Sequence, residues 1–129
     1  MSADMFLETY AKDESLSIAE QITDSRCVSS TMLKRGAWHI YHWMKDEVKV
    51  MVGDERFILN GRDLYNFLID CHTVQRIPEK NETFFPGHGK IQKEDPDYFD
   101  SIDELVTICS RLTRNLDFNE YHLVFRVKL

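Results

Sequence analysis

The C-terminal segment shows the clearest alternation of apolar and polar positions in the chain. Between residues 121 and 129, Tyr, Leu, Phe, Val and Leu occupy the odd positions, and mostly polar residues occupy the even ones. Successive side chains of a strand point to opposite faces, so this pattern predicts a half-buried strand. We expect Phe125 to lie in the hydrophobic core.

Three further runs are rich in residues that favour strands, and turn signals separate them. The runs are residues 37–44, 48–52 and 56–59, and the turns are residues 45–47 and Gly53-Asp54. Asn60-Gly61 then ends the third run. Short connections favour antiparallel neighbours, so residues 37–59 are predicted to form a three-stranded meander.

Two helices are predicted from capping signals. Ser17 and Glu20 have the S-x-x-E spacing of a capping box, in which each side chain bonds a free backbone N–H of the first turn. Ser101 and Glu104 have the same spacing, and an apolar stripe follows them as far as Leu112. Helices are therefore expected to begin at Ser17 and at Ser101.

Other helical segments are predicted from spacing alone. Residues 62–72 carry four apolar side chains at positions i, i+3, i+4 and i+7, which form one face of an amphipathic helix. Residues 4–11 predict a short helical turn, and residues 29–35 predict a short helix that Gly36 ends. Together the elements predict one α+β domain over residues 1–129, with an antiparallel sheet of about four strands and helices packed on one face.

Composition and charge narrow the class of protein. Apolar residues make up 43% of the 129 residues and charged residues 29%, as in a globular domain. No apolar run is long enough to span a membrane, and residues 1–8 do not have the pattern of a signal peptide. The odd cysteine count argues against a disulfide framework, so we expect free thiols and a cytoplasmic location, in the protein's own cell or in a host.

The net charge of −6 points away from direct nucleic-acid binding, because no basic surface matches the phosphate backbone. Acidic residues concentrate in residues 1–25 and 93–104. The second cluster lacks the glycine and the alternating spacing of an EF-hand loop, and two of its members fall in a predicted first helical turn. No cofactor or metal ion is therefore predicted.

Catalytic patterns are weak in this sequence. On a strand, His39 and His42 would point to opposite faces and could not share a metal ion. Cys71 fits an apolar helical stripe, and neighbouring His72 points about 100° away from it. Phosphate-binding and dinucleotide-binding glycine motifs and the serine-hydrolase elbow are missing from the sequence.

Residues 75–100 show no clear period, and a long irregular segment in a small domain is often functional. It combines paired aromatics with carboxylates, as binding surfaces do. The predicted partner-binding residues are Phe84, Phe85, His88, Asp95, Asp97, Tyr98, Phe99 and Asp100.

These observations predict a small acidic, non-catalytic domain that binds another protein, as an adaptor or inhibitor does. Two alternatives stay open. One is a small enzyme that uses His88, exposed between two glycines, with a second histidine or a cysteine. The other is an acidic mimic of nucleic acid that occupies a basic groove of its target. The sequence does not identify the partner or the oligomeric state.

Overall fold

A computed structural model describes residues 4–33, 38–53, 55–85 and 96–128, apart from the side chains of Pro96 and Asp97. The strands are β1 (Asp4–Ala11), β2 (Cys27–Met32), β3 (Val50–Val52), β4 (Arg56–Leu59) and β5 (Tyr121–Lys128). The helices are α1 (Ile18–Gln21), α2 (Trp38–Glu47), α3 (Gly61–Arg76), α4 (Asn81–Phe84) and α5 (Pro96–Asn115), with 3-10 turns η1 (Asp24–Arg26) and η2 (Pro78–Lys80).

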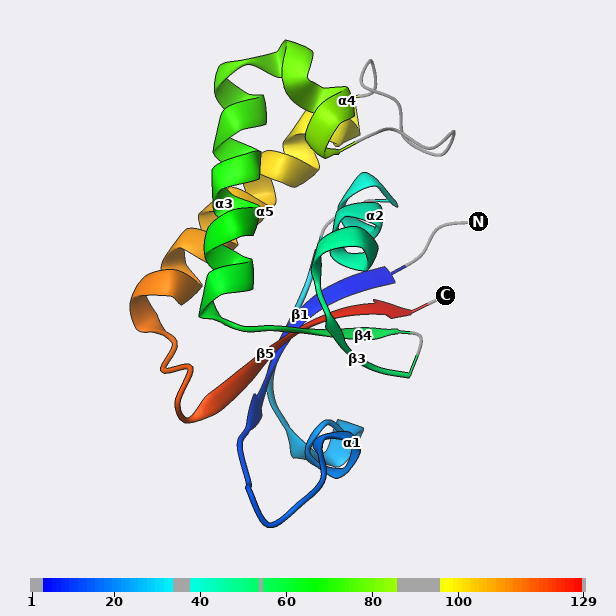
Figure 1. The fold of residues 1–129 in the computed structure, drawn as a ribbon, viewed down its shortest axis with the longest axis vertical. Helices are drawn as coiled ribbons and strands as arrows, with labels where there is room; N and C mark the ends of the chain where they lie inside the picture. The colour runs from blue at the N-terminus through cyan, green and yellow to red at the C-terminus, as the bar shows by residue number, and fades with distance from the viewer. Residues whose placement is uncertain (1–3, 34–37, 54, 86–95, 129) are drawn as a thin grey trace.

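The five strands form one antiparallel sheet in the order β2-β1-β5-β4-β3. Helices α2 to α5 lie on one side of this sheet, and the short α1 lies on the other (Figure 1). The predicted α+β architecture is confirmed, with five strands instead of about four. Among the described helices, none is long and apolar enough to cross a membrane.

The two faces of the sheet carry different cores. The larger core joins the helix-facing side chains of the strands to helices α2, α3 and α5, and Phe125 lies within it as expected. The smaller core, on the α1 side, is formed by Tyr10, Ile22, Ile58 and Val124. Phe125 and Val124 are neighbours on β5, so one strand supplies both cores.

The prediction that residues 37–44 form the first strand of a meander is wrong, because residues 38–47 form helix α2. Its buried side chains are His39, Ile40, Trp43 and Met44, which follow a helical period. The aromatic residues favoured a strand, but burial at i, i+3 and i+4 decided the element in favour of a helix. The hairpin of β3 and β4 that follows is as predicted, with Gly53 at φ +63° in its turn.

The predictions of helix at residues 4–11 and 29–33 are wrong in the opposite sense, and residues 34–36 of the second prediction lie outside the described residues. Residues 4–11 form β1, a central strand bonded to β2 and β5, and residues 27–32 form β2. Because β1 is covered on both faces, five of its eight side chains are buried, four of them in succession, and the alternation that marks a strand is hidden.

Residues 75–100 contain more helix than the sequence predicted. Helix α3 continues to Arg76, η2 and α4 follow, and α5 begins at Pro96. The capping box at Ser17 is present, but Ser101 lies inside α5 and caps nothing. Proline suits the first turn of α5 because its missing N–H would have no intrahelical partner there. Asn60 and Asp63 form a capping box at the start of α3, as Ser17 and Glu20 do at the start of α1.

Candidate functional site

The predicted partner-binding residues divide between the core and the surface. Phe85 and Tyr98 are fully buried, Phe84 and Phe99 are partly buried against the core, and Asp100 is exposed. His88 and Asp95 lie outside the described residues, as does the side chain of Asp97. Of the predicted set, Phe84, Phe99 and Asp100 are therefore the residues that the structure places at or near the surface.

Phe85 and Tyr98 instead fasten α4 and α5 to the rest of the fold. The Tyr98 hydroxyl donates to the backbone carbonyls of Phe85 and Asn81, and its ring stacks on His39 with centroids 4.2 Å apart. Phe85 packs edge-on against Phe67, with centroids 5.9 Å apart. Side chains with these contacts contribute to the core and are not available to a partner.

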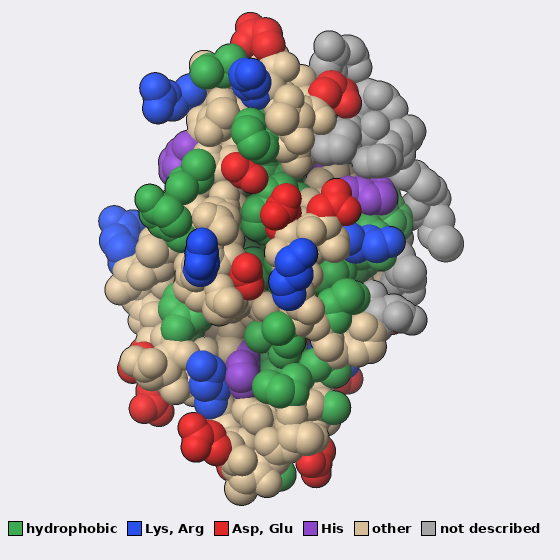
Figure 2. Space-filling model, in the orientation of Figure 1, with side chains coloured by type: hydrophobic (Ala, Val, Ile, Leu, Met, Phe, Trp, Pro, Cys, Tyr) green, Lys and Arg blue, Asp and Glu red, His purple; other side chains and the backbone are tan. Residues whose placement is uncertain are grey.

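Phe84, next to this anchor, lines a small pocket between α2, α3 and α4. The pocket has a volume of about 100 Å³, and its lining residues are Trp43, Asp46, Glu47, Asp70, Thr83 and Phe84. Its walls thus combine two aromatic rings with three carboxylates and one hydroxyl. Figure 2 shows acidic side chains in the upper half of this face, where these helices lie, and again at its lower end.

Helix geometry brings the acidic groups together. Trp43 and Glu47 are one turn apart on α2, near its end, and Asp70 comes from the middle of α3. The Trp43 indole Nε1–H donates to Asp70 Oδ2 over 2.8 Å. This hydrogen bond fixes the ring and one carboxylate relative to each other at the floor of the pocket.

The electrostatics of the pocket favour a cation. Burial raises the pKa of Asp70, and the hydrogen bond from Trp43 opposes that rise. Among the residues that the structure describes, neither Asp70 nor Asp46 nor Glu47 forms an ion pair. A positive charge placed here would lower the pKa of Asp70.

The sequence prediction missed Trp43, Asp46, Glu47 and Asp70. Residues 37–44 were predicted as a strand and residues 45–47 as a turn, so the prediction separated Trp43 from Asp46 and Glu47. The signal that would have placed them together is the helical spacing of the apolar residues Ile40, Trp43 and Met44 in the sequence. The contribution of Asp70 depends on how α3 packs against α2, which no local pattern specifies.

A second cluster, formed by His39, Ser101 and Tyr98, resembles a catalytic pair in distance but not in protonation. His39 Nε2 lies 2.9 Å from Ser101 Oγ and 3.1 Å from the Tyr98 carbonyl oxygen, and Ser101 Oγ also donates to that carbonyl. Nε2 must carry the proton to bond a carbonyl, so it cannot accept one from the serine. Burial lowers the pKa of His39 to about 4, and the cluster anchors the first turns of α5.

Two of the three cysteine thiols lie in the core, and the third is partly exposed at the surface. Cys71 and Cys109 are buried, and burial raises the pKa of both, that of Cys109 to about 12. Cys27 is partly exposed, and the structure assigns all three as free thiols. Within the described ranges, no group of three or more histidines, cysteines or carboxylates is arranged to hold a metal ion.

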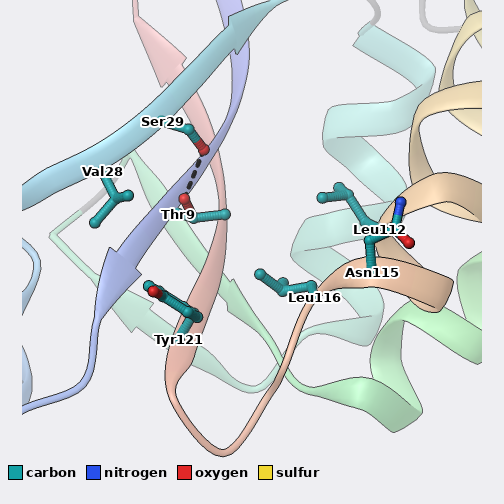
Figure 3. Close-up of a pocket in the computed structure, with 7 residues that line it drawn as sticks. All are labelled: Thr9, Val28, Ser29, Leu112, Asn115, Leu116 and Tyr121. Carbon is teal, nitrogen blue, oxygen red and sulfur yellow. Dashed lines mark hydrogen bonds between the residues drawn. The ribbon is translucent and has the colours of Figure 1, made fainter.

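An apolar pocket lies at the other end of the helix-facing side of the sheet (Figure 3). Its volume is about 180 Å³, and its lining residues are Thr9, Val28, Ser29, Leu112, Asn115, Leu116 and Tyr121. It opens between β2 and the end of α5, and the Thr9 and Ser29 hydroxyls share a 2.6 Å hydrogen bond at its wall (Figure 3). Comparison with known protein families, curated proteins and solved structures found no match for this chain.

Proposed function

We propose that this chain is a non-catalytic protein-binding domain, and that the pocket beside Phe84 accepts a lysine or arginine side chain of the partner. The observation that carries the proposal is the lining of the pocket, where Asp46, Glu47 and Asp70 surround the rings of Trp43 and Phe84. Carboxylates attract the cationic end of such a side chain, and aromatic rings favour both its charge and its apolar stem.

The size and floor of the pocket support a side chain as the ligand. A volume of about 100 Å³ fits one cationic group and leaves no room for a cofactor. Trp43 is held by its bond to Asp70, so the ring needs no reordering when the ligand enters. The net charge of −6 would also speed the approach of a basic partner at low salt.

The test uses blocked tripeptides with a central arginine, lysine or glutamine, titrated into the isotopically labelled chain. The Trp43 indole N–H is a direct reporter because it lies at the pocket floor, and Trp38 supplies the second indole signal as a reference. We expect the arginine and lysine peptides to shift the Trp43 signal, the glutamine peptide to leave it in place, and added salt to weaken the response.

A matched pair of variants separates the pocket from the overall charge. Asp46→Asn with Glu47→Gln removes two pocket charges and should reduce the shift several-fold. Glu14→Gln with Glu120→Gln removes two exposed charges outside the pocket lining and should leave it almost unchanged. An equal loss in both pairs, or an equal response to the glutamine peptide, would overturn the proposal.

A further inference from the structure

The apolar pocket between β2 and the end of α5 lies at an irregularity in the sheet. Thr9 of β1 faces Ser29 of β2, and Tyr10 faces Cys27, so Val28 has no partner on β1. One extra residue in one strand of an antiparallel pair is a β-bulge, and bulges redirect side chains and often lie beside functional sites. The bulge at Val28 interrupts the alternation of β2 at the wall of this pocket.

The bulge brings two successive side chains of β2 to the same pocket. Regular alternation would direct Val28 and Ser29 to opposite faces of the sheet. Instead both side chains line the pocket on the helix-facing side (Figure 3). Val28 is 59% exposed, so its side chain forms an open wall and does not join the core. The pocket therefore has one of its apolar walls because of the bulge.

The size of the pocket limits what it can hold. Leu112 and Leu116, at the end of α5 and just beyond it, supply apolar walls, and Thr9 and Tyr121 come from β1 and β5. The volume is about 180 Å³. A closed apolar cavity of about 150 Å³ holds one benzene ring. The pocket therefore has room for a single ring with a short substituent.

The lining favours an uncharged ligand. In the described part of the chain, none of the residues that line this pocket carries a charge. Moving a carboxylate or an ammonium group out of water without a counter-charge is costly, so ionic ligands are disfavoured. The pocket beside Phe84 is different, because three carboxylates there favour a cation.

A pair of hydroxyls gives this apolar pocket one polar wall. Thr9 Oγ1 and Ser29 Oγ lie 2.6 Å apart and share a hydrogen bond (Figure 3). Two hydroxyls carry two protons, and this bond uses only one of them. Within the described residues, neither hydroxyl forms another hydrogen bond. The second proton and the unused lone pairs are therefore available to a group that both donates and accepts, as a hydroxyl does.

We propose that this pocket binds a small, uncharged, free molecule with one ring and one hydroxyl, of the class of the monocyclic phenols. The ring lies between Val28 and the two leucines, and the hydroxyl bonds to the Thr9–Ser29 pair. The position of the apolar walls and of the hydroxyl pair thus matches the two parts of such a molecule. The proposal is independent of the proposed function, since the two pockets share no lining residue.

A free molecule suits the pocket better than a side chain of a protein partner. A stable protein interface buries on the order of 800 Å² on each partner, with several apolar side chains at its centre. Among the described residues, Val28 is the only exposed large apolar side chain of the pocket lining. The next one on β2, Met32, pairs with Phe6 and lies on the other face of the sheet. The surface around the opening therefore offers little further contact area.

The test is a titration of para-cresol into the full chain with labelled methyl groups, followed by NMR. We expect saturable shifts of the Val28, Leu112 and Leu116 methyl signals with a dissociation constant of about 1 mM, as for a small ligand in an open site. The Leu33 methyl signals, from the buried residue that follows β2, should stay in place. Para-toluate, which has the same ring with a charged group, should cause no saturable shift.

A pair of variants tests the role of the hydroxyls. The measured quantity is the affinity for para-cresol relative to toluene, which lacks the hydroxyl. Thr9→Val/Ser29→Ala should lower this ratio about fivefold, because one hydrogen bond is lost. Ser30→Ala removes a hydroxyl of the same strand that bonds Glu8 on the other face, and it should leave the ratio unchanged. Thermal melts check that both variants fold.

Three outcomes would overturn the proposal. The first is the lack of a saturable shift at the pocket methyl groups of the unaltered protein. The second is a ratio that the double variant leaves unchanged, or that Ser30→Ala lowers equally. The third is tighter binding of a blocked tyrosine amide than of para-cresol, because that result would assign the pocket to a side chain of a protein partner. The first and third outcomes require no substitution, so they apply even if the double variant does not fold.

Discussion

The two faces of the sheet are stabilised by different chemistry. The helix-facing side is apolar, with Leu7, Phe57 and Phe125 packed against three helices. On the α1 side the core is small, and the buried carboxylate of Glu8 lies beside it. The comparison suggests that most of the stability comes from the first face, and that the second depends on completing its polar contacts.

The polar contacts of the second face are extensive but incomplete. Glu8 accepts hydrogen bonds from Tyr10, over 2.7 Å, and from Ser30, over 3.0 Å. Arg126 lies 3.8 Å from Glu8 and 3.4 Å from Asp24, so neither ion pair is close. Within the described residues, the Nε atom of Arg126 is buried without a hydrogen-bond partner. Such a network stabilises less than apolar packing of equal volume.

The largest expected effect comes from core substitutions on the two faces of the sheet, which test this comparison directly. Phe125→Ala should lower the free energy of unfolding by on the order of 3–5 kcal/mol, because it opens a cavity in the larger core. Val124→Ala, one residue away and equally buried, should cost roughly 2 kcal/mol in the smaller core. Urea unfolding measures both. If Val124→Ala lowers the free energy of unfolding as much as Phe125→Ala does, the smaller core contributes as much as the larger one and the comparison is wrong.

The next effect depends on pH and compares two histidines. Burial lowers the folded-state pKa of His39 from 6.5 to about 4, so the unfolded chain binds a proton first as pH falls. The contribution of His39 to the free energy of unfolding is therefore fully present above pH 6.5. It is lost between pH 6.5 and 4, by roughly 3 kcal/mol. His122, on the other face, has a pKa lowered by burial and by Lys12, and its contribution has the same sign.

Chemical unfolding at a series of pH values separates the two histidines. His39→Gln should flatten the rise in unfolding free energy between pH 4 and 6.5, whereas His122→Gln should change that slope less, because His122 is partly exposed. The slope is the informative quantity, since each substitution also alters packing. An unchanged slope in His39→Gln would show that His39 is protonated in the folded state over this range.

The fold was predictable from the sequence where an element shows a regular pattern of apolar positions, even in β5, which contributes to both cores. β5 and α3 alternate or repeat plainly, and the structure places Phe125 and Cys71 in the core as predicted. The prediction failed at β1, where both faces are covered, and at α2, where aromatic residues outweighed a helical period. In both cases tertiary packing overrode residue preference.

The candidate site was less predictable than the fold. The sequence placed Phe84 near a partner contact, but it could not show that Phe85, the next residue, is turned into the core. Asp70 reaches the pocket through the packing of two helices and through its bond from Trp43. Long-range contacts of this kind leave no local signature, so the acidic pocket emerges from the fold alone.

A smaller effect tests the polar network of the second face. Glu8→Gln keeps the shape but removes the charge, and we expect a loss of about 2 kcal/mol in unfolding free energy because Tyr10, Ser30 and Arg126 all face that carboxylate. Tyr10→Phe should cost about 1 kcal/mol. A double-mutant cycle should give a coupling energy near 1 kcal/mol. Strict additivity would mean that the 2.7 Å bond from Tyr10 contributes nothing to stability.

The smallest perturbation leaves stability unchanged and compares the two faces through their thiols. Cys71 and Cys109 lie in the larger core, and Cys27 begins β2 on the α1 side, where burial first and Glu8 second raise its pKa. Because alkylation requires the thiolate and an open path, Cys27 should react first, and more slowly than a free peptide thiol. Cys71 and Cys109 should react together, at a rate set by global unfolding.

Alkylation followed by mass measurement distinguishes these classes, and adding reductant beforehand should change neither the number of reactive thiols nor their order. Early labelling of Cys109 would show that α5 opens independently of the helix-facing core.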